Sequence, residues 1–161
     1  MEEHFEGLQK LVALCRENSI DLQFVLTPGH ILKRRILEKS SQVTAYENWK
    51  RRIIALGPKT WDFNDVNSVT TGPVSVDRPY FEDMGHFYQD VGDLMIVRVL
   101  GVNSPDIPED FGQVVSPETL ETHLKGERSR YKMWKQNNPT DIKQLEKYYK
   151  RKASNPAEPD S

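Results

Sequence analysis

The stretch Pro79-Tyr-Phe-Glu-Asp-Met-Gly-His-Phe-Tyr-Gln-Asp-Val-Gly-Asp-Leu-Met-Ile-Val-Arg-Val-Leu-Gly101 organises this chain. It begins with aromatic residues around an Asp83-x-x-His86 pair and continues into an amphipathic segment. The segment predicts a helix that begins near Asp90, whose carboxylate can cap it, and that ends at Gly101. Asp83 and His86 would then lie in the loop that enters the helix, where α/β folds place functional side chains. The predicted apolar face consists of Leu94, Ile96, Val97 and Leu100.

Composition limits the size of the core and the class of protein. The chain has 161 residues, of which 37% are apolar, and its mean hydropathy is -0.68. This length suits one domain with a modest core, which we place between Phe5 and Val102. The formal net charge of -2 argues against general nucleic-acid binding. The single cysteine, Cys15, excludes an internal disulfide, and no apolar run approaches the roughly 20 residues of a membrane span. The acidic N-terminus does not resemble a secretory signal, and we assign no compartment.

Two short apolar runs, Leu22–Leu26 and Thr60–Phe63, predict strands. The residues between them predict two helices, so the strands should pair in parallel through a right-handed crossover. The first run breaks at Thr27-Pro28-Gly29-His30, and polar residues that include Asn67 follow the second. Open α/β sheets bind ligands at the carboxyl ends of their strands. We therefore predict that His30 and Asn67 contact a substrate, with a helix-start role as the alternative for His30.

The helical patterns continue on both sides of the central stretch. A helix that stops at Gly57-Pro58 carries a predicted buried face of Tyr46, Trp49, Ile53 and Leu56. We predict a partial α/β domain over residues 1–102 and a connector over residues 103–115. A helical arm over residues 116–152 would start at Ser116-Pro117-Glu118 and break at Asn137-Asn-Pro139, before a disordered tail over residues 153–161. The arm is rich in Lys and Arg, and a solvated helix face explains this better than contact with phosphate or a membrane.

In their order, these motifs resemble the C-terminal half of SGNH-hydrolase-like proteins, in a branch related to alginate O-acetyltransferases. The likeness extends over about residues 5–140. It implies a three-layer α/β sandwich and an activity of ester hydrolysis or acyl transfer, with full-length relatives in the bacterial cell envelope. The motifs that carry it are Pro28-Gly29-His30, Tyr46-Glu-Asn-Trp-Lys50, Trp61-Asp-Phe63, Asn67-Ser-Val-Thr-Thr71, Asp83-Met-Gly-His86 and Val91-Gly-Asp-Leu94.

The resemblance implies that His86 is a general base and that Asp83 orients it. A serine hydroxyl needs an imidazole to take its proton, and the imidazole needs a carboxylate to fix its tautomer. The family's serine lies in an early Gly-Asp-Ser-like block, which this sequence does not contain. We therefore expect part of an acyl-ester hydrolase or acyltransferase that is inactive as an isolated chain, or alternatively a non-catalytic binding or interaction module. Candidate hydroxyls within the chain are Ser68, Thr70, Thr71 and Ser75, none of them in a strand–turn–helix elbow.

The predicted fold is a partial three-layer α/β sandwich with a short parallel sheet, followed by the helical C-terminal arm. A sheet of two strands leaves open edges, so we expect a homodimer or a partner chain that completes the sheet. Zinc could be bound by His30, Asp83 and His86, but nothing in their spacing requires it. We assign no metal and no cofactor.

Overall fold

The computed structural model describes the backbone of residues 2–72 and 80–154, and the side chains of these residues as far as Lys147. Mixed helix and strand confirm the α/β class. None of the helices in these ranges is long and apolar enough to cross a membrane. The elements are α1 (Glu2–Glu17), β1 (Gln23–Leu26), α2 (Leu32–Lys39), α3 (Val43–Ile54), β2 (Lys59–Asp62), α4 (Gln89–Val99), β3 (Gln113–Val115), α5 (Leu120–Asn137) and α6 (Pro139–Ser154).

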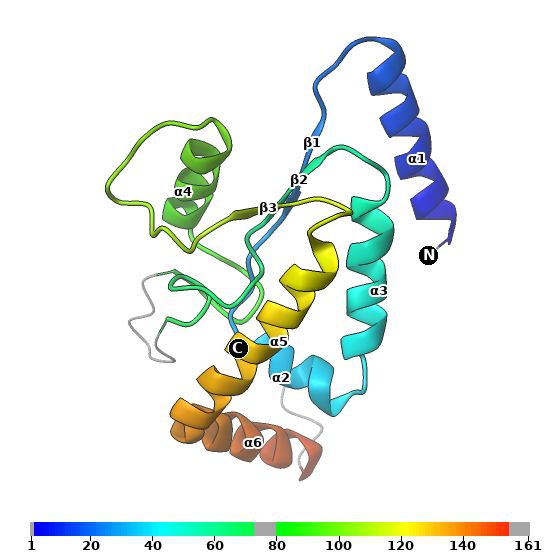
Figure 1. Cartoon of the computed structure of the whole chain (residues 1–161). Coiled ribbons are helices and arrows are strands. Elements are labelled where there is room, and N and C mark those ends of the chain that lie inside the picture. The colour runs from blue at the N-terminus through cyan, green and yellow to red at the C-terminus, as the bar shows by residue number, and fades with distance from the viewer. Residues whose placement is uncertain (1, 73–79, 155–161) are drawn as a thin grey trace.

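The three strands form one small sheet in the order β1-β2-β3 (Figure 1). β1 and β2 are parallel, with Val25 opposite Trp61, so this part of the prediction is confirmed. β3 pairs antiparallel with β2, with Val114 opposite Trp61, and the sheet is therefore mixed rather than parallel. Sequence analysis assigned residues 113–115 to a connector because three residues are too few to show a readable alternation. They form a strand because β2 offers them an open edge of backbone donors and acceptors.

Gly112 lets the chain enter β3. Its φ is +82°, a conformation that side chains other than glycine rarely adopt. A Cβ at this position would overlap the ring of Phe63, which follows β2. Glycine therefore allows β3 to lie beside β2 while Phe63 stays in the core.

Successive side chains of β2 point to opposite faces of the sheet. Trp61 packs with Phe63 on the side of α4, in a core that includes Val91 and Met95. Asp62 faces the other side, where α3 and α5 lie. Figure 1 shows α4 on one side of the strands and α1, α3 and α5 on the other. A second apolar cluster on the α3 and α5 side consists of Ile54, Val115, Leu120 and Leu124.

α4 begins within one residue of its predicted start, but its predicted cap is wrong and its predicted face is only partly right. It ends before Gly101, whose φ of +69° fits the predicted stop. Its N-cap residue is Tyr88, which makes no side-chain cap hydrogen bond, and Asp90 lies within the first turn, so the predicted Asp90 cap is wrong. The fully buried residues are Val91 and Met95, whereas Ile96 and Leu100 of the predicted face are exposed. Leu94 and Val97 of the predicted face are partly buried and pack against the core, as the aromatic loop before the helix does.

The other helices follow their predicted boundaries more closely than their predicted faces. α3 ends before Gly57, and a break at Asn138 separates α5 from α6, as predicted. α5 begins at Leu120 rather than at Ser116, because Ser116 to Thr119 forms a turn that precedes the helix. Trp49, predicted to lie in the core, is exposed. α6 includes residues 153 and 154 of the predicted tail, and the rest of that tail lies outside the described residues.

Candidate functional site

The side chains of Asp83 and His86 contact each other. The Nδ1–H group of His86 donates a hydrogen bond to Asp83 Oδ2 at 2.7 Å. Asp83 Oδ1 accepts the backbone N–H groups of Gly85 at 2.6 Å and of His86 at 2.7 Å, which fixes the turn. When Nδ1 carries the proton, Nε2 of the neutral ring keeps its lone pair. The arrangement therefore presents the nitrogen that can take up a proton.

Asp83 and His86 both face solvent, with side chains that are 57% and 78% exposed. The hydrogen bond to Asp83 raises the pKa of His86. The same bond, together with two backbone N–H groups, lowers the pKa of Asp83 to about 2. Water and salt screen these interactions at an exposed position. The pair is thus an accessible imidazole with a carboxylate behind it.

The turn that holds Asp83 and His86 is attached to the turn that follows β1. The backbone N–H of His30 donates to the carbonyl oxygen of Met84 at 3.0 Å. Lys33, in the first turn of α2, brings its ammonium group to 3.8 Å from the position a Cβ would take on Gly85. The pair consequently lies at the carboxyl end of β1, the edge where open α/β sheets bind ligands.

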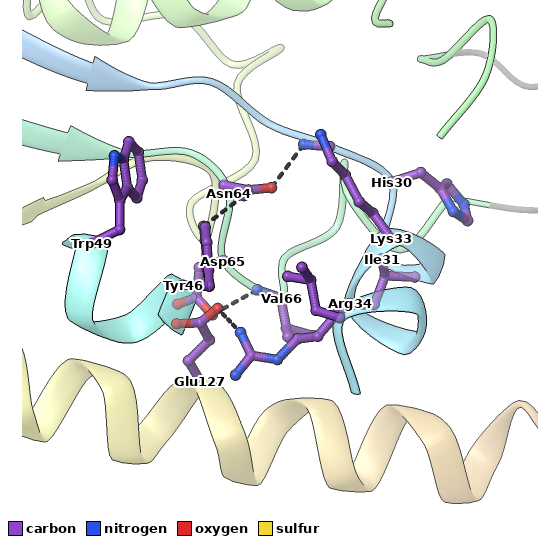
Figure 2. Close-up of a pocket in the computed structure, with 12 residues that line it drawn as sticks. His30, Ile31, Lys33, Arg34, Tyr46, Trp49, Asn64, Asp65, Val66 and Glu127 are labelled. Carbon is purple, nitrogen blue, oxygen red and sulfur yellow. Dashed lines mark hydrogen bonds and ion pairs between the residues drawn. The ribbon is translucent and has the colours of Figure 1, made fainter. Parts of the chain in front are cut away.

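A pocket of about 320 Å³ opens beside this turn. Figure 2 shows that its walls come from the turn after β1, from α2 and α3, from the loop after β2, and from α5. Lys33 belongs both to the pocket wall and to the surroundings of Gly85. Tyr46, Trp49 and Asn64 also line the pocket. Asp83 and His86 do not line the pocket themselves, but their turn is joined to its wall through Lys33 and His30.

His30, a predicted substrate contact, uses its ring within the protein. It is buried in the pocket wall, and its ring points away from Tyr46 and Glu127 in Figure 2. Nε2–H donates to the carbonyl oxygen of Gly72 at 3.0 Å, and Nδ1 accepts the backbone N–H of Leu32 at 3.3 Å. Both ring nitrogens bind backbone, and these bonds hold the start of α2, which was the alternative role for His30.

Asn67, the other predicted substrate contact, organises the loop after β2. Its Oδ1 accepts the backbone N–H groups of Val69 at 3.0 Å and Thr70 at 2.9 Å. Its Nδ2 donates to the carbonyl oxygens of Phe63 at 3.1 Å and Asp65 at 3.0 Å. Asn67 is buried, and its side chain is fully engaged by these four partners. Its bonds shape the loop, and Asn67 is not among the residues that line the pocket described above.

The hydroxyls that the sequence offers as nucleophiles bond elsewhere. Ser68 Oγ donates to Asp110 Oδ2 at 2.8 Å, and the two threonine hydroxyls donate to backbone carbonyls of their own loop. Ser75 lies outside the described residues. Within the described part of the chain, His86 therefore has no hydroxyl bonded to it. The described candidates are Ser68, Thr70 and Thr71.

A second constellation, which sequence analysis missed, is buried between β2, α3 and α5. Lys50 Nζ donates to Asp62 Oδ2 at 2.6 Å and to Glu127 Oε2 at 3.2 Å. The Nε2–H group of His123 donates to the same Asp62 oxygen at 2.9 Å. Arg34 donates to the other oxygen of Glu127 and shares the pocket wall with it. We call these five residues the buried charge network.

The ionisation of the network follows from its pairing. Burial by itself lowers the pKa of Lys50, but the carboxylates of Asp62 and Glu127 outweigh it, and the pKa of Lys50 is raised. Burial by itself raises the pKa of Asp62, but hydrogen bonds from His123 and Lys50 bring it to about 2. Both groups are therefore charged at neutral pH, which suits a structural ion pair.

Three members of the network also have the chemistry of metal ligands. Asp62, His123 and Glu127 offer ligand atoms that all lie within 4.8 Å of one another. However, Lys50 Nζ already bonds to the carboxylates of both Asp62 and Glu127. The ammonium group takes the place that a bound cation would need, so the protein balances this charge itself. We assign no metal to the cluster.

A sequence signal for the network does exist. Lys50 lies four residues after Tyr46 and three before Ile53, on the apolar stripe of α3. Glu127 lies three residues after Leu124, on the stripe of α5. Charged residues at such positions are normally assigned to solvent, because they are seldom buried unless paired. A charge that interrupts an apolar stripe at helical spacing is the feature that indicates burial here.

Comparisons of the chain with family models, with curated proteins and with solved structures found no match.

Proposed function

We propose that this chain carries the acid–base half of an SGNH-like acyl-ester site, in an enzyme that hydrolyses an ester or transfers its acyl group. His86 acts as the general base, and Asp83 orients the ring and stabilises its charged form. The observation that carries the proposal is the 2.7 Å hydrogen bond between His86 Nδ1 and Asp83 Oδ2, on a ring that is open to solvent. The neighbouring pocket supports it, because a substrate needs space beside the base.

In the proposed reaction, His86 Nε2 takes the proton of a hydroxyl as its oxygen attacks the ester carbonyl carbon. The imidazolium then gives this proton to the departing alcohol as the ester bond breaks. The acyl group is left on the hydroxyl oxygen and passes to water or to an acceptor alcohol in a second, equivalent step. The attacking hydroxyl belongs to a residue outside the described part of the chain or to a partner.

The same proposal includes a partner, another chain or a second copy, at the free edge of β1. In the described sheet β1 pairs with β2 alone, and the in-register residues Val25, Trp61 and Val114 form an apolar row across one face. Val25 and Val114 are both exposed. A strand added parallel to β1 would end beside the turn that anchors the Asp83–His86 loop, and a hydroxyl there would approach His86. With helices on both faces, the completed sheet would be a three-layer sandwich.

A non-catalytic binding module on the same scaffold is the second candidate. Two observations favour it. The hydroxyls of Ser68, Thr70 and Thr71 bond to groups other than His86, so none of them is placed as a nucleophile. The pocket could bind a small molecule without any reaction. In this case Asp83 and His86 would contribute only a surface turn.

Hydrolysis of a short-chain aryl ester separates the two candidates. Any exposed imidazole hydrolyses such esters slowly, so the matched control is His4→Ala, which removes an exposed histidine of α1. We expect His86→Ala to remove most of the rate above buffer, Asp83→Asn to give an intermediate rate, and His4→Ala to match the unchanged chain. Equal rates in all four proteins would remove the claim that His86 and Asp83 act as a dyad in this chain and would favour the binding module.

A further inference from the structure

Four charged side chains line the pocket beside the Asp83–His86 turn, and their formal charges balance, with the cations Lys33 and Arg34 against the anions Asp65 and Glu127. Two of its charged side chains, Arg34 and Glu127, pair with each other. Asp65, also in the wall, accepts a hydrogen bond from Arg130. Lys33 is exposed and forms no ion pair with any described side chain, since the nearby Asp83 is bonded to His86 and to its own backbone. Lys33 is therefore a cation of the wall that is left to pair with an anionic ligand, while the other three charges are paired within the described residues.

Tyr46 supplies a positioned hydroxyl donor to the same pocket. The backbone N–H of Gly29 donates to Asn64 Oδ1 at 2.8 Å, and Asn64 Nδ2 donates to the Tyr46 hydroxyl oxygen at 2.7 Å. The oxygen is an acceptor in this chain of bonds, and its own proton has no acceptor among the described residues. Burial raises the pKa of Tyr46 to about 12, so the hydroxyl keeps its proton at neutral pH. Tyr46 can therefore donate to a ligand oxygen.

Part of the wall is apolar. Leu37 and Val66 line the pocket, and so does the exposed ring of Trp49. Trp49 stacks on Tyr46 with ring centroids 5.8 Å apart. A volume of about 320 Å³ with an apolar part suits a small organic molecule. The ligand should thus combine an apolar body with one anionic end.

We propose that this pocket binds small organic monocarboxylates, with the carboxylate against the Tyr46 hydroxyl and the Lys33 ammonium group, and the apolar body against Val66, Leu37 and Trp49. A carboxylate can accept both hydrogen bonds at once and pairs with the one available cation. The Lys33 ammonium group repels protonated amines, and an uncharged amide forms no ion pair with it. That this carboxylate corresponds to the acyl part of an ester substrate rests on the proposed function, whereas the binding itself does not.

The probe is sodium hexanoate, with hexanamide as its uncharged counterpart. Binding to the full chain is followed by Trp fluorescence and by the NMR signals of Gly29 and the Asn64 side-chain amide. We expect Lys33→Met to weaken hexanoate binding by about tenfold and to leave hexanamide unchanged. Tyr46→Phe should weaken both ligands. Lys125→Met and Tyr88→Phe, which change an exposed lysine and an exposed tyrosine that do not line the pocket, are the controls and should bind as the unchanged chain does.

Equal hexanoate affinity in the unchanged chain and in Lys33→Met would overturn the proposal. So would the absence of saturable shifts at Gly29 and Asn64 up to the solubility limit of hexanoate. Lys33 is exposed, so its variant should fold, and the comparison holds even if Tyr46→Phe does not fold. No ester is present in this measurement. Hexanoate binding without aryl-ester activity would therefore support this inference and count against the proposed function. Aryl-ester activity without hexanoate binding would support the proposed function and count against this inference.

Discussion

Asp62 and Asp83 both have a pKa of about 2, yet they lie in opposite surroundings. Asp62 is buried and accepts hydrogen bonds from Lys50 and His123, which belong to two different helices. Asp83 is exposed and is bonded to His86 and the backbone of its own turn. An acid–imidazole contact occurs in both places. It can hold the fold together where water is excluded, and it is open to a reactant where water has access.

The two carboxylates differ in how much free energy is lost when the hydrogen-bond partner of each is removed. A buried charge without a partner has no water to solvate it, so the cost of removing the partner is large. An exposed charge exchanges its partner for water at little cost. The two sites should therefore respond differently to the same kinds of substitution, and the effects below run from the largest to the smallest.

The largest effect should follow Lys50→Met. This change keeps most of the side-chain volume but leaves the carboxylates of Asp62 and Glu127 without their shared cation. We expect the free energy of unfolding, measured in urea, to fall by about 3–5 kcal/mol. Lys125→Met, at an exposed position of α5, is the control and should change it little. A loss of similar size in both variants would contradict a structural role for the network.

The stability of the protein should fall in acid as the buried Asp62 carboxylate is protonated. Its pKa in the folded chain is about 2, below the ordinary value of about 3.9, so its contribution is present above pH 4 and is lost as the pH falls towards 2. We expect a loss of about 2–3 kcal/mol in the free energy of unfolding over this interval. Asp62→Asn should flatten this dependence, whereas Asp83→Asn should not, because water screens Asp83. Equal flattening in both variants would remove the distinction between the two carboxylates.

A smaller effect should appear in the titration of His86. Its hydrogen bond to Asp83 raises its pKa above the ordinary value of about 6.5. In Asp83→Asn, the pKa measured by NMR should return towards that value, and added salt should reduce the shift in the unchanged chain. Because the folded pKa is raised, the small stabilisation from this pair is present at low pH and disappears as the pH rises through the folded pKa. A pKa that is the same with and without the Asp83 carboxylate would show that the contact is not formed in solution.

The smallest effect should be that of His86→Ala on folding. The ring is exposed, so the midpoint of urea unfolding should stay where it is, even if the aryl-ester rate falls. Circular dichroism during urea titration provides the measurement, with Lys50→Met as the positive reference. A clear drop in the midpoint of His86→Ala would mean that this turn is structural and would weaken the case for chemistry there.

The sequence by itself determined the features that depend on near neighbours. β1 and β2, the ends of α3 and α4 at Gly57 and Gly101, and the break before Pro139 could all be predicted. The Asp83–His86 turn belongs with them, because its hydrogen bonds join residues at most three positions apart. Such features follow from the conformational preferences of glycine and proline and from short-range hydrogen bonds, all of which can be recognised in a local stretch of sequence.

Only the tertiary structure decided which distant residues share an environment. Lys50 finds its partners Asp62 and Glu127 at separations of 12 and 77 residues, and β3 becomes a strand only where β2 offers it an edge. The large apolar side chain of Trp49 was predicted to lie in the core, but it lines a pocket and is exposed to solvent. Burial and charge pairing depend on what the rest of the fold brings to a residue. For this reason a polar residue such as Lys50 can be buried at a position where its local sequence pattern predicts exposure to solvent.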